Sequence, residues 1–391
     1  MAELWKNKFN HETVSGFARD ISSVYSSFQT DDFIKSVVDE TWEDLELMAR
    51  GKRITVTMKE YLPQDYGEAL GIMDKVIGDC DPFFKMCFPT YVEIYGQDDI
   101  NWDLSMRAME FFTQHSSSEF AVRPFIIKHE KRMMAQMYEW SKHENEHVRR
   151  LSSEGCRPAL PWGQALNSFK KDPSPVLPIL VQLNTDPSEY VRKSVANNLN
   201  DISKTHPDLI AGLAKDWYGK HKYTDWIVKH GCRTLLKKGN RDVLGIFGFD
   251  DVDSLEVSGF ALDVSADAVS SGVDSSGTVS SGAASSGVDS SAAVPTVRIG
   301  GEMNFAFTVF AKEESKVRLE YGIDFVKSNG KRNRKIFQIS EIQFKDNQKK
   351  SYTKTHSFED LSTRKHYPGL HSITLIVNGT ERGTLDFEVT G

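Results

Sequence analysis

The stretch Asp186-Pro-Ser-Glu-Tyr-Val-Arg-Lys-Ser-Val-Ala-Asn-Asn-Leu199 decides how the longer part of this 391-residue chain folds. Its Asp-Pro pair marks a turn, after which Ser188 is a suitable N-cap residue. Glu189 follows in the first turn, where the helix dipole favours a negative charge. One apolar stripe at four-residue spacing contains Val191, Val195 and Leu199. The stretch therefore predicts an amphipathic helix whose stripe packs inward.

The same signature of cap, glutamate and Val-Arg pair occurs twice earlier in the chain. The three copies are Ser118-Glu-Phe-Ala-Val-Arg123, which has one extra residue, Asn145-Glu-His-Val-Arg149 and Ser188-Glu-Tyr-Val-Arg192. Glu146 and Glu189 are 43 residues apart, and HEAT repeats recur about every 40–47 residues. The sequence thus predicts a HEAT-like-repeat α-solenoid, whose stacked helix pairs form a concave surface.

A change of composition divides the chain. Residues 270–294 repeat a Ser-Ser-Gly period and contain no aromatic residue and no large aliphatic residue except valine. Such a segment cannot bury enough apolar surface to offset its ordering entropy. We therefore expect a helical domain over residues 1–250, a flexible Ser/Gly-rich linker over 251–294 and a second domain over 295–391.

The second domain alternates apolar and polar residues, which is typical of strands. Asn378-Gly379 is a hairpin signal between two of them. The expected strands include 304–310, 317–321, 337–344, 371–377 and 383–389. About seven short strands in this length predict an immunoglobulin-like β-sandwich.

Charge and motifs limit the possible function. The net charge is −7, although residues 295–391 contain 16 basic and 12 acidic residues. The four cysteines show no metal-ligand spacing, and no apolar run approaches the roughly 20 residues that span a bilayer. We expect a reduced, cytoplasmic protein that has no membrane partner. Phosphate-binding loops, dinucleotide fingerprints, HExxH and GxSxG are absent, which leaves kinase, dehydrogenase, metalloprotease and serine-hydrolase functions without their usual support.

Residues 147–163 contain a charged cluster. Arg150, Glu154 and Arg157 share one helical face because residues three and four apart are neighbours. A carboxylate between two guanidiniums either forms an ion-pair ladder between repeats or faces a substrate, and residue type alone favours the ladder. Trp162, in the proline-limited loop that follows, either stacks on a nucleobase or fills the space between repeats.

Other candidates lie at equivalent repeat positions. Lys193 aligns with Arg150, and it shares a helical face with Asp201, so this surface mixes basic groups that suit phosphates with a few acids. Glu119 occupies the same helix-start position as Glu146 and Glu189, where capping electrostatics explain a glutamate.

A basic run, Lys331-Arg-Asn-Arg-Lys335, follows a Ser-Asn-Gly turn. Four charges in five residues on a hairpin tip suit a phosphate backbone, and a solvated loop is the alternative. The candidate DNA contacts of this domain are Lys331, Arg332, Arg334 and Lys335.

Three stretches together resemble AlkC-type DNA glycosylases, members of the AlkC/AlkD superfamily of HEAT-like-repeat alkylation-repair enzymes. They are Ser117-Ser-Glu-Phe-Ala-Val-Arg-Pro-Phe125, Glu154-Gly-Cys-Arg-Pro-Ala-Leu-Pro-Trp-Gly163 and the repeat from Asp186 to Asp201. The resemblance covers roughly Phe9 to Phe249. The order of solenoid, linker and immunoglobulin-like domain is similar to the AlkC proteins that have this C-terminal addition.

The resemblance implies a monofunctional enzyme that excises 3-methyladenine and 3-methylcytosine from double-stranded DNA and leaves an abasic site. It implies Glu154 as the principal electrostatic stabiliser or general base, with Glu119 and Asp201 as further catalytic acids. Trp162 would pack on the lesion nucleotide, and Arg157 would hold a phosphate or orient a carboxylate. No metal and no cofactor is implied, and the protein is expected to be a monomer that associates with the nucleoid while it acts. A non-catalytic HEAT-repeat scaffold that binds DNA or protein is the alternative.

Overall fold

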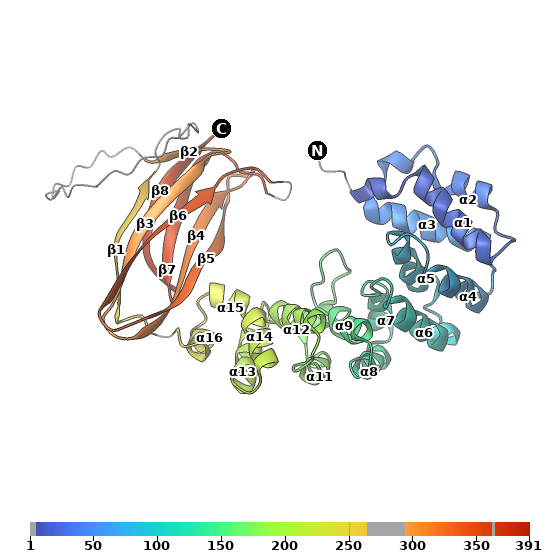
Figure 1. Ribbon diagram of the computed structural model, residues 1–391, viewed down its shortest axis with the longest axis horizontal. Helices are drawn as coiled ribbons and strands as arrows, with labels where there is room; N and C mark the ends of the chain where they lie inside the picture. The colour runs from blue at the N-terminus through green and yellow to red at the C-terminus, as the bar shows by residue number, and fades with distance from the viewer. Residues whose placement is uncertain (1–4, 250, 264–293, 362–363) are drawn as a thin grey trace. The chain divides into compact units, whose positions relative to one another are not determined.

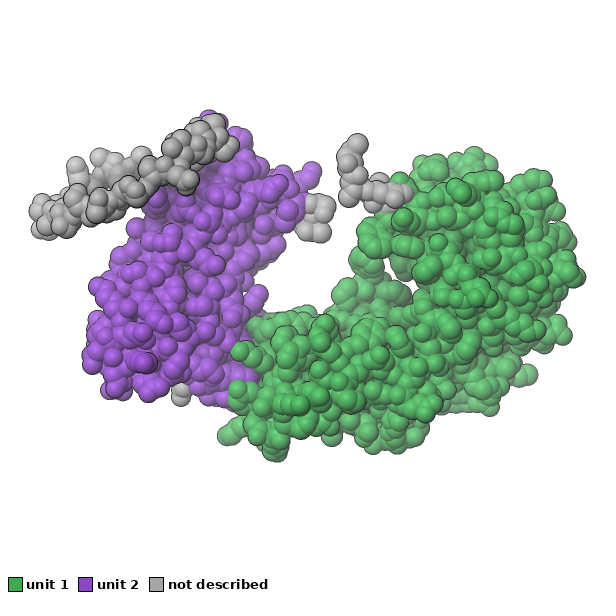
Figure 2. All heavy atoms as spheres, in the orientation of Figure 1, with its two compact units in different colours: residues 1–234 green, residues 235–391 purple. Residues whose placement is uncertain are grey.

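The computed structural model describes residues 5–249, 251–263, 294–361 and 364–391. The chain forms two compact units, Met1–Thr234 and Leu235–Gly391 (Figure 2). The first is helical and the second is built mainly of strands, so the expected order of a helical part followed by a β-sandwich is confirmed.

The first unit consists of short helices joined by tight turns. The described α-helices are α1 (His11–Val24), α2 (Thr30–Val37), α3 (Leu47–Tyr61), α4 (Tyr66–Val76), α5 (Cys87–Tyr95), α6 (Trp102–Phe112), α7 (Val122–Lys128), α8 (Glu130–Trp140), α9 (Glu146–Glu154), α10 (Asn167–Lys171), α11 (Leu177–Gln182), α12 (Glu189–Ile202), α13 (Pro207–Trp217) and α14 (Lys222–Gly231). Single turns of 3-10 helix occur at η1 (Trp5–Lys8), η2 (Trp42–Asp44), η3 (Phe84–Met86) and η4 (Asp99–Asn101). None of the helices in the described residues has the length and apolar character needed to cross a bilayer.

Helices of the repeat copies lie side by side. Helix α12 packs against α9 on one side and α14 on the other, while α8, α11 and α13 form a second row beside them (Figure 1). Val148 and Leu151 of α9 and Val191 and Val195 of α12 are completely buried. The apolar stripe that the sequence predicted is therefore the surface on which these helices stack.

The arginine of the Val-Arg pair holds the turn before its own helix in two copies. Arg149 Nη1 donates to the carbonyl oxygens of His143 (3.0 Å) and Glu144 (2.6 Å). Arg192 Nη1 donates in the same way to Asp186 (3.0 Å) and Pro187 (2.7 Å). These bonds satisfy carbonyl groups that the turn would otherwise leave without partners.

The second unit is a two-layer β-sandwich whose described strands are β1 (Leu255–Asp263), β2 (Thr296–Arg298), β3 (Glu302–Ala311), β4 (Ser315–Val326), β5 (Arg332–Phe344), β6 (Gln348–Ser357), β7 (Gly369–Val377) and β8 (Thr380–Thr390). One sheet has the order β1-β3-β6 and the other the order β2-β8-β7-β4-β5. Helix α15 (Arg233–Lys237) leads into this unit, and α16 (Arg241–Ile246) packs near the β7–β8 hairpin, where Arg241 Nη2 donates to Thr380 Oγ1 at 2.8 Å.

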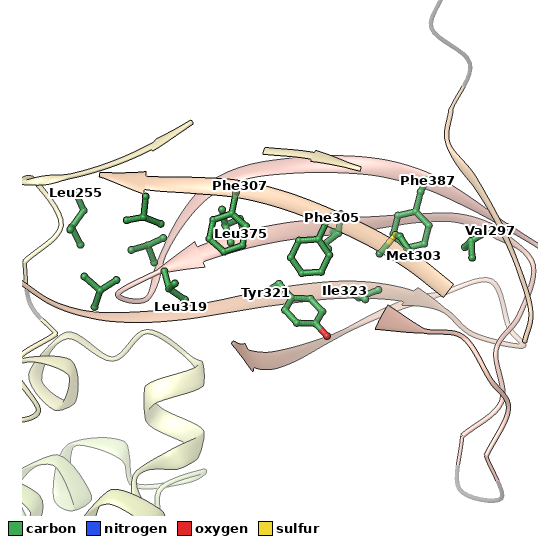
Figure 3. Packing of buried hydrophobic residues seen from close by; sticks show 14 of the residues in the cluster. Leu255, Val297, Met303, Phe305, Phe307, Leu319, Tyr321, Ile323, Leu375 and Phe387 are labelled. Atoms are coloured by element: carbon green, nitrogen blue, oxygen red, sulfur yellow. The ribbon is translucent and has the colours of Figure 1, made fainter. Parts of the chain in front are cut away.

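Alternation along the strands builds the core of the sandwich. Every second residue of β3 from Met303 to Ala311 is buried. Figure 3 shows Phe305 and Phe307 of β3 and Leu375 of β7 between the two sheets. Such alternation is expected where one face of each sheet is apolar.

Asn378-Gly379 forms the expected hairpin turn, with φ values of 48° and 72°. Both central residues of this turn have positive φ, which Asn and Gly tolerate. Position 379 also has no space for a side chain, because a Cβ at Gly379 would lie 2.6 Å from Leu244 Cδ1.

Part of the expected linker is a strand. Leu255–Asp263 forms β1, which pairs antiparallel with β3 from Leu255↔Ala311 to Asp263↔Asn304. Leu255 is buried, while Glu256 on the opposite side pairs with Lys312 at 2.7 Å. Acidic composition concealed this alternation in the sequence. Residues 264–293 of the expected linker lie outside the described residues.

Three histidines, His356, His366 and His371, lie among the aromatic rings of the sandwich. The ring of Phe358 is 5.1 Å from that of His356 and 5.3 Å from that of His366. Burial, together with the charges of Arg364 and His366, lowers the pKa of His356 to about 4. Burial also lowers the pKa values of His366 and His371.

Acid should therefore destabilise the sandwich. Because the pKa of folded His356 lies below its ordinary 6.5, the unfolded chain binds more protons, and the stability that the neutral ring contributes is lost as pH falls from 6.5 towards 4. The loss from this residue between pH 7 and pH 5 should be about 2 kcal/mol. This loss of stability can be measured by hydrogen exchange of peptides from β4 and β7 at the two pH values. His356→Gln should reduce the pH dependence, and an unaltered dependence in that variant would contradict the assignment.

Candidate active site

A cleft of about 980 Å³ lies in the first unit. Its polar side includes Glu119, Glu154 and Arg157. The other lining residues are mostly apolar and come from the N-terminal turns and from the loop after α9, among them Trp5, Leu47, Met48, Phe83, Met86, Leu160, Pro161 and Trp162. The cleft therefore places charged groups against a largely apolar wall, where water screens charges less than at an open surface.

Carboxylates and guanidiniums alternate beside this cleft. Arg150 donates to Glu119 and lies 3.5 Å from Glu154. Arg157 donates to Glu154 Oε1 at 2.5 Å and to Asp201 Oδ2 at 2.9 Å. We call the series Glu119–Arg150–Glu154–Arg157–Asp201 the charge chain. Each carboxylate in it is next to a cation, so the acids lie near one another without direct repulsion between neighbours.

Helix packing assembles the charge chain from three segments. Arg150 and Glu154 project from α9, and Arg157 follows one turn later. Asp201 comes from α12, which packs against α9, and Glu119 precedes α7. Glu154, Arg157 and Asp201 are 5%, 7% and 4% exposed, so these three groups are removed from bulk water.

Arg157 stays charged in this environment. Burial of its guanidinium opposes the charge, but Glu154 and Asp201 outweigh that effect and raise the pKa of Arg157. The guanidinium consequently fixes both carboxylates by charge-assisted hydrogen bonds, which are the stronger kind.

Arg150 makes contacts in the site that the sequence did not indicate. The i,i+4 relation to Glu154 was visible in the sequence, but the bond to Glu119 depends on how the segment before α7 meets α9. The Arg150 guanidinium also lies over the ring of Tyr190, 5.1 Å from its centroid. Tyr190 was not a sequence candidate, because nothing in its spacing connects it with Glu119.

Trp162 stands on the loop at the edge of the cleft. Its side chain is 86% exposed, and its φ of 63° lies in the left-handed region that residues other than glycine rarely adopt. A large exposed aromatic on a strained backbone is unusual in a monomeric fold and points to a contact surface.

Lys193 does not join the charge chain. It is exposed on α12 and pairs with Glu189 at 2.8 Å, one turn away on the same helix. Lys193 occupies the same helical position as Arg150, as the repeat alignment predicted, but its ammonium group pairs with the glutamate of its own helix.

The basic residues of the run 331–335 lie in different surroundings. Arg334 on β5 pairs with Asp324 at 2.7 Å and also with Glu381 at 2.5 Å, and these bonds raise its pKa. Arg332 donates to Ser372 Oγ at 3.0 Å. Within the described part of the chain the Lys335 ammonium has no such ion pair, and its pKa is lowered by burial and by the charges of Arg364 and Lys327.

Comparison with known proteins gives matches for both units. A family model described as DNA alkylation repair enzyme matches residues 113–235, and one described as the C-terminal Ig-like domain of the uncharacterised protein YhaZ matches residues 288–391. The uncharacterised protein YhaZ of Bacillus subtilis (strain 168) is 44% identical over 393 residues, covering 100% of both chains. Among solved structures, the alkylpurine DNA glycosylase AlkC of Pseudomonas fluorescens, bound to DNA containing an abasic site analogue, is similar with a TM-score of 0.88 and 31% identity over 100% of both chains.

Removal of Arg157 should destabilise the first unit. Arg157→Gln leaves Glu154 and Asp201 without their shared cation in a buried setting, which should cost about 3 kcal/mol. The matched control is Lys204→Gln, since Lys204 also pairs with Asp201 at 2.8 Å but is 47% exposed, and its loss should cost less than about 1 kcal/mol. Urea unfolding followed by tryptophan fluorescence reports this unit, because all seven tryptophans precede residue 235. Equal losses in the two variants would contradict the stabilising role of Arg157.

Proposed function

Because the chain belongs to the AlkC-type family of DNA alkylation-repair enzymes, we propose that it is a monofunctional DNA glycosylase acting on cationic N3-alkylated bases. It hydrolyses the N-glycosidic bond of 3-methyladenine and 3-methylcytosine in duplex DNA and leaves an abasic site. The observation that carries the proposal is the convergence of Glu119 and Glu154 on one cleft that also has Trp162 at its edge.

The reaction needs negatively charged carboxylates, and it does not need a side chain that donates a proton. An N3-alkylated base is already positively charged, so it leaves as a neutral molecule and needs no proton from the enzyme. What must be stabilised is the positive charge that develops on the deoxyribose as the bond lengthens, and what must be oriented is the attacking water. Carboxylates that are held in place before the reaction supply both effects at low reorganisation cost.

We assign a role to each acid from its place in the charge chain. Glu154, fixed by Arg157 in the cleft wall, is the principal electrostatic stabiliser or general base. Glu119, which accepts from Arg150 and also lines the cleft, is the second carboxylate that faces the sugar. Asp201 acts through Arg157, so of the two roles open to this arginine the geometry supports orientation of a carboxylate.

Trp162 packs on the lesion nucleotide. Lys193, whose pair with Glu189 is solvent-exposed and therefore weak, contributes to the phosphate-binding surface. We assign the catalytic domain to residues 1–250, of which 235–249 pack with the second compact unit, and the DNA-contacting domain to residues 295–391, to which β1 adds a strand. The chain binds DNA as a monomer and uses no metal or cofactor. A scaffold function would not require two glutamates to share one cleft with an exposed tryptophan.

Base release tests the enzymatic proposal. Glu154→Gln should lower the single-turnover release of 3-methyladenine from methylated duplex DNA by about 100-fold or more, because it removes the charge that stabilises the sugar cation. The matched control is Glu146→Gln on the same helix, since Glu146 is exposed and accepts from Ser188. Release in the control should stay near the wild-type rate.

Two results would refute the proposal. One is tight DNA binding by the wild-type protein with no release of any alkylated base, which the scaffold function predicts. The other is an unchanged rate in Glu154→Gln.

Charge removal on the sandwich should change the salt dependence of DNA binding. Lys331→Gln and Lys335→Gln should each reduce the slope of log K against log salt by about 1, because each ammonium that contacts a phosphate releases a counterion. Arg334→Gln is the comparison, since Asp324 and Glu381 already neutralise Arg334. An unchanged slope in both lysine variants would exclude this run as a phosphate contact.

A further inference from the structure

Arg123 is a buried arginine that binds backbone carbonyl groups instead of a carboxylate. It is 1% exposed, and its Nε donates to the Gln164 oxygen at 2.5 Å. Its Nη1 donates to the oxygens of Gly155 (2.9 Å) and Arg157 (3.0 Å). No ion pair of Arg123 occurs among the residues that the structure describes, and its Nη2 has no hydrogen-bond partner there.

The three carbonyls lie at both ends of one loop. Gly155 and Arg157 lie one and three residues after Glu154, the last residue of α9, whereas Gln164 comes after Trp162. Carbonyl groups at a helix C-terminus lack intrahelical partners, and a cation there also interacts favourably with the helix dipole. One guanidinium therefore closes the segment 155–164 at its beginning and its end.

The sequence motif shows that this role is particular to Arg123. Arg149 and Arg192 occupy the same place in the other two Val-Arg copies, and each holds the turn before its own helix. Arg149 also pairs with the Asp186 carboxylate 37 residues ahead, whereas the bonds of Arg123 go to backbone carbonyls of the loop after α9. Arg123 belongs to the copy with one extra residue, and its donors reach forward by 32 to 41 residues to the next repeat. A repeat arginine has been redirected from its own turn to the loop beside the cleft.

That loop needs an external support. Trp162 has a positive φ, and its exposed side chain contributes little packing of its own. Within the loop, Gly163 N donates to Leu160 O at 3.1 Å and Leu166 N donates to Pro158 O at 3.2 Å. Strained conformations persist where the surrounding structure holds them, and the Arg123 bonds are a strong part of that surrounding structure.

We propose that Arg123 is a positioning residue of the active site: it holds the Trp162 loop and the Glu154 end of α9 in one arrangement. This inference rests on the proposed glycosylase function. The arginine touches no substrate and acts through Trp162 and Glu154. It remains a cation at neutral pH, since burial lowers its pKa only to about 10.

The test compares Arg123→Lys with Arg192→Lys. A lysine keeps the charge but cannot reach three carbonyls in a fixed fork. Arg123→Lys should reduce single-turnover base release at saturating enzyme by about 10- to 100-fold, as the loss of an outer support typically does. It should also speed hydrogen exchange at the Gly163 and Leu166 amides. Arg192→Lys makes the same substitution at the equivalent motif position and should alter neither measurement.

A double-mutant cycle with Trp162→Phe separates positioning from a general loss of stability. If Arg123 acts through the loop, the losses in Arg123→Lys and Trp162→Phe are strongly non-additive. Gly163→Ala provides a second variant if Arg123→Lys does not fold, because its Cβ would press on Leu160, Phe120 and Arg123 at 3.1–3.4 Å. This variant should show the same slow release with faster loop exchange.

Three results would overturn the inference: wild-type release by Arg123→Lys, slow release without faster loop exchange, or additive losses in the cycle. If the wild-type protein releases no base, the proposed glycosylase function is wrong, whatever the role of Arg123. In that case hydrogen exchange still decides whether Arg123 holds the loop.

Discussion

Two carboxylates, Glu119 and Glu154, can share the wall of one cleft, with Asp201 beyond Arg157, because two guanidiniums separate the three acids. In a setting where water screens weakly, Glu119, Glu154 and Asp201 would repel one another by several kcal/mol without Arg150 and Arg157. Charge-assisted hydrogen bonds from the two arginines hold the carboxylate oxygens in fixed directions. A carboxylate that is fixed and charged before the substrate arrives is what stabilisation of a sugar cation needs.

Close helix packing is the condition for this alternation. A Cβ on Gly155 would lie 2.5 Å from Val122 Cγ2 and 2.8 Å from Met137 Cε, so only glycine lets α9 approach α7 and α8 so closely. On its other side α9 meets α12, where Ser153 Oγ and Ser194 Oγ are 2.7 Å apart. Small side chains at both contacts bring Glu119 and Asp201, which are distant in sequence, within reach of Arg150 on α9 and of Arg157 just after it.

Local periodicity made the fold predictable, while the site depended on contacts between segments. The stripe of α12 and the alternation of β3 are properties of a few consecutive residues, and these predictions are confirmed. The bond between Arg150 and Glu119 spans 31 residues and has no local signal. The neutralisation of Lys193 by Glu189 was visible at four-residue spacing but has the same pattern as an ordinary surface pair. Strand β1 escaped prediction because its alternation breaks off after Ser258, where the register shifts before Ala261, and because the surrounding sequence is acidic.

Under the proposed function, the same ion pairs that prepare the cleft for a sugar cation make it a poor site for phosphates. Arg150 and Arg157 are occupied by carboxylates, so the cleft offers DNA little uncompensated positive charge. The affinity for the phosphate backbone must then come from cations outside the charge chain. Residues 295–391, with their excess of basic over acidic residues, contain such cations. Separation of affinity from catalysis follows from the electrostatics, since cations placed at the cleft to attract phosphates would oppose the positive charge of the transition state.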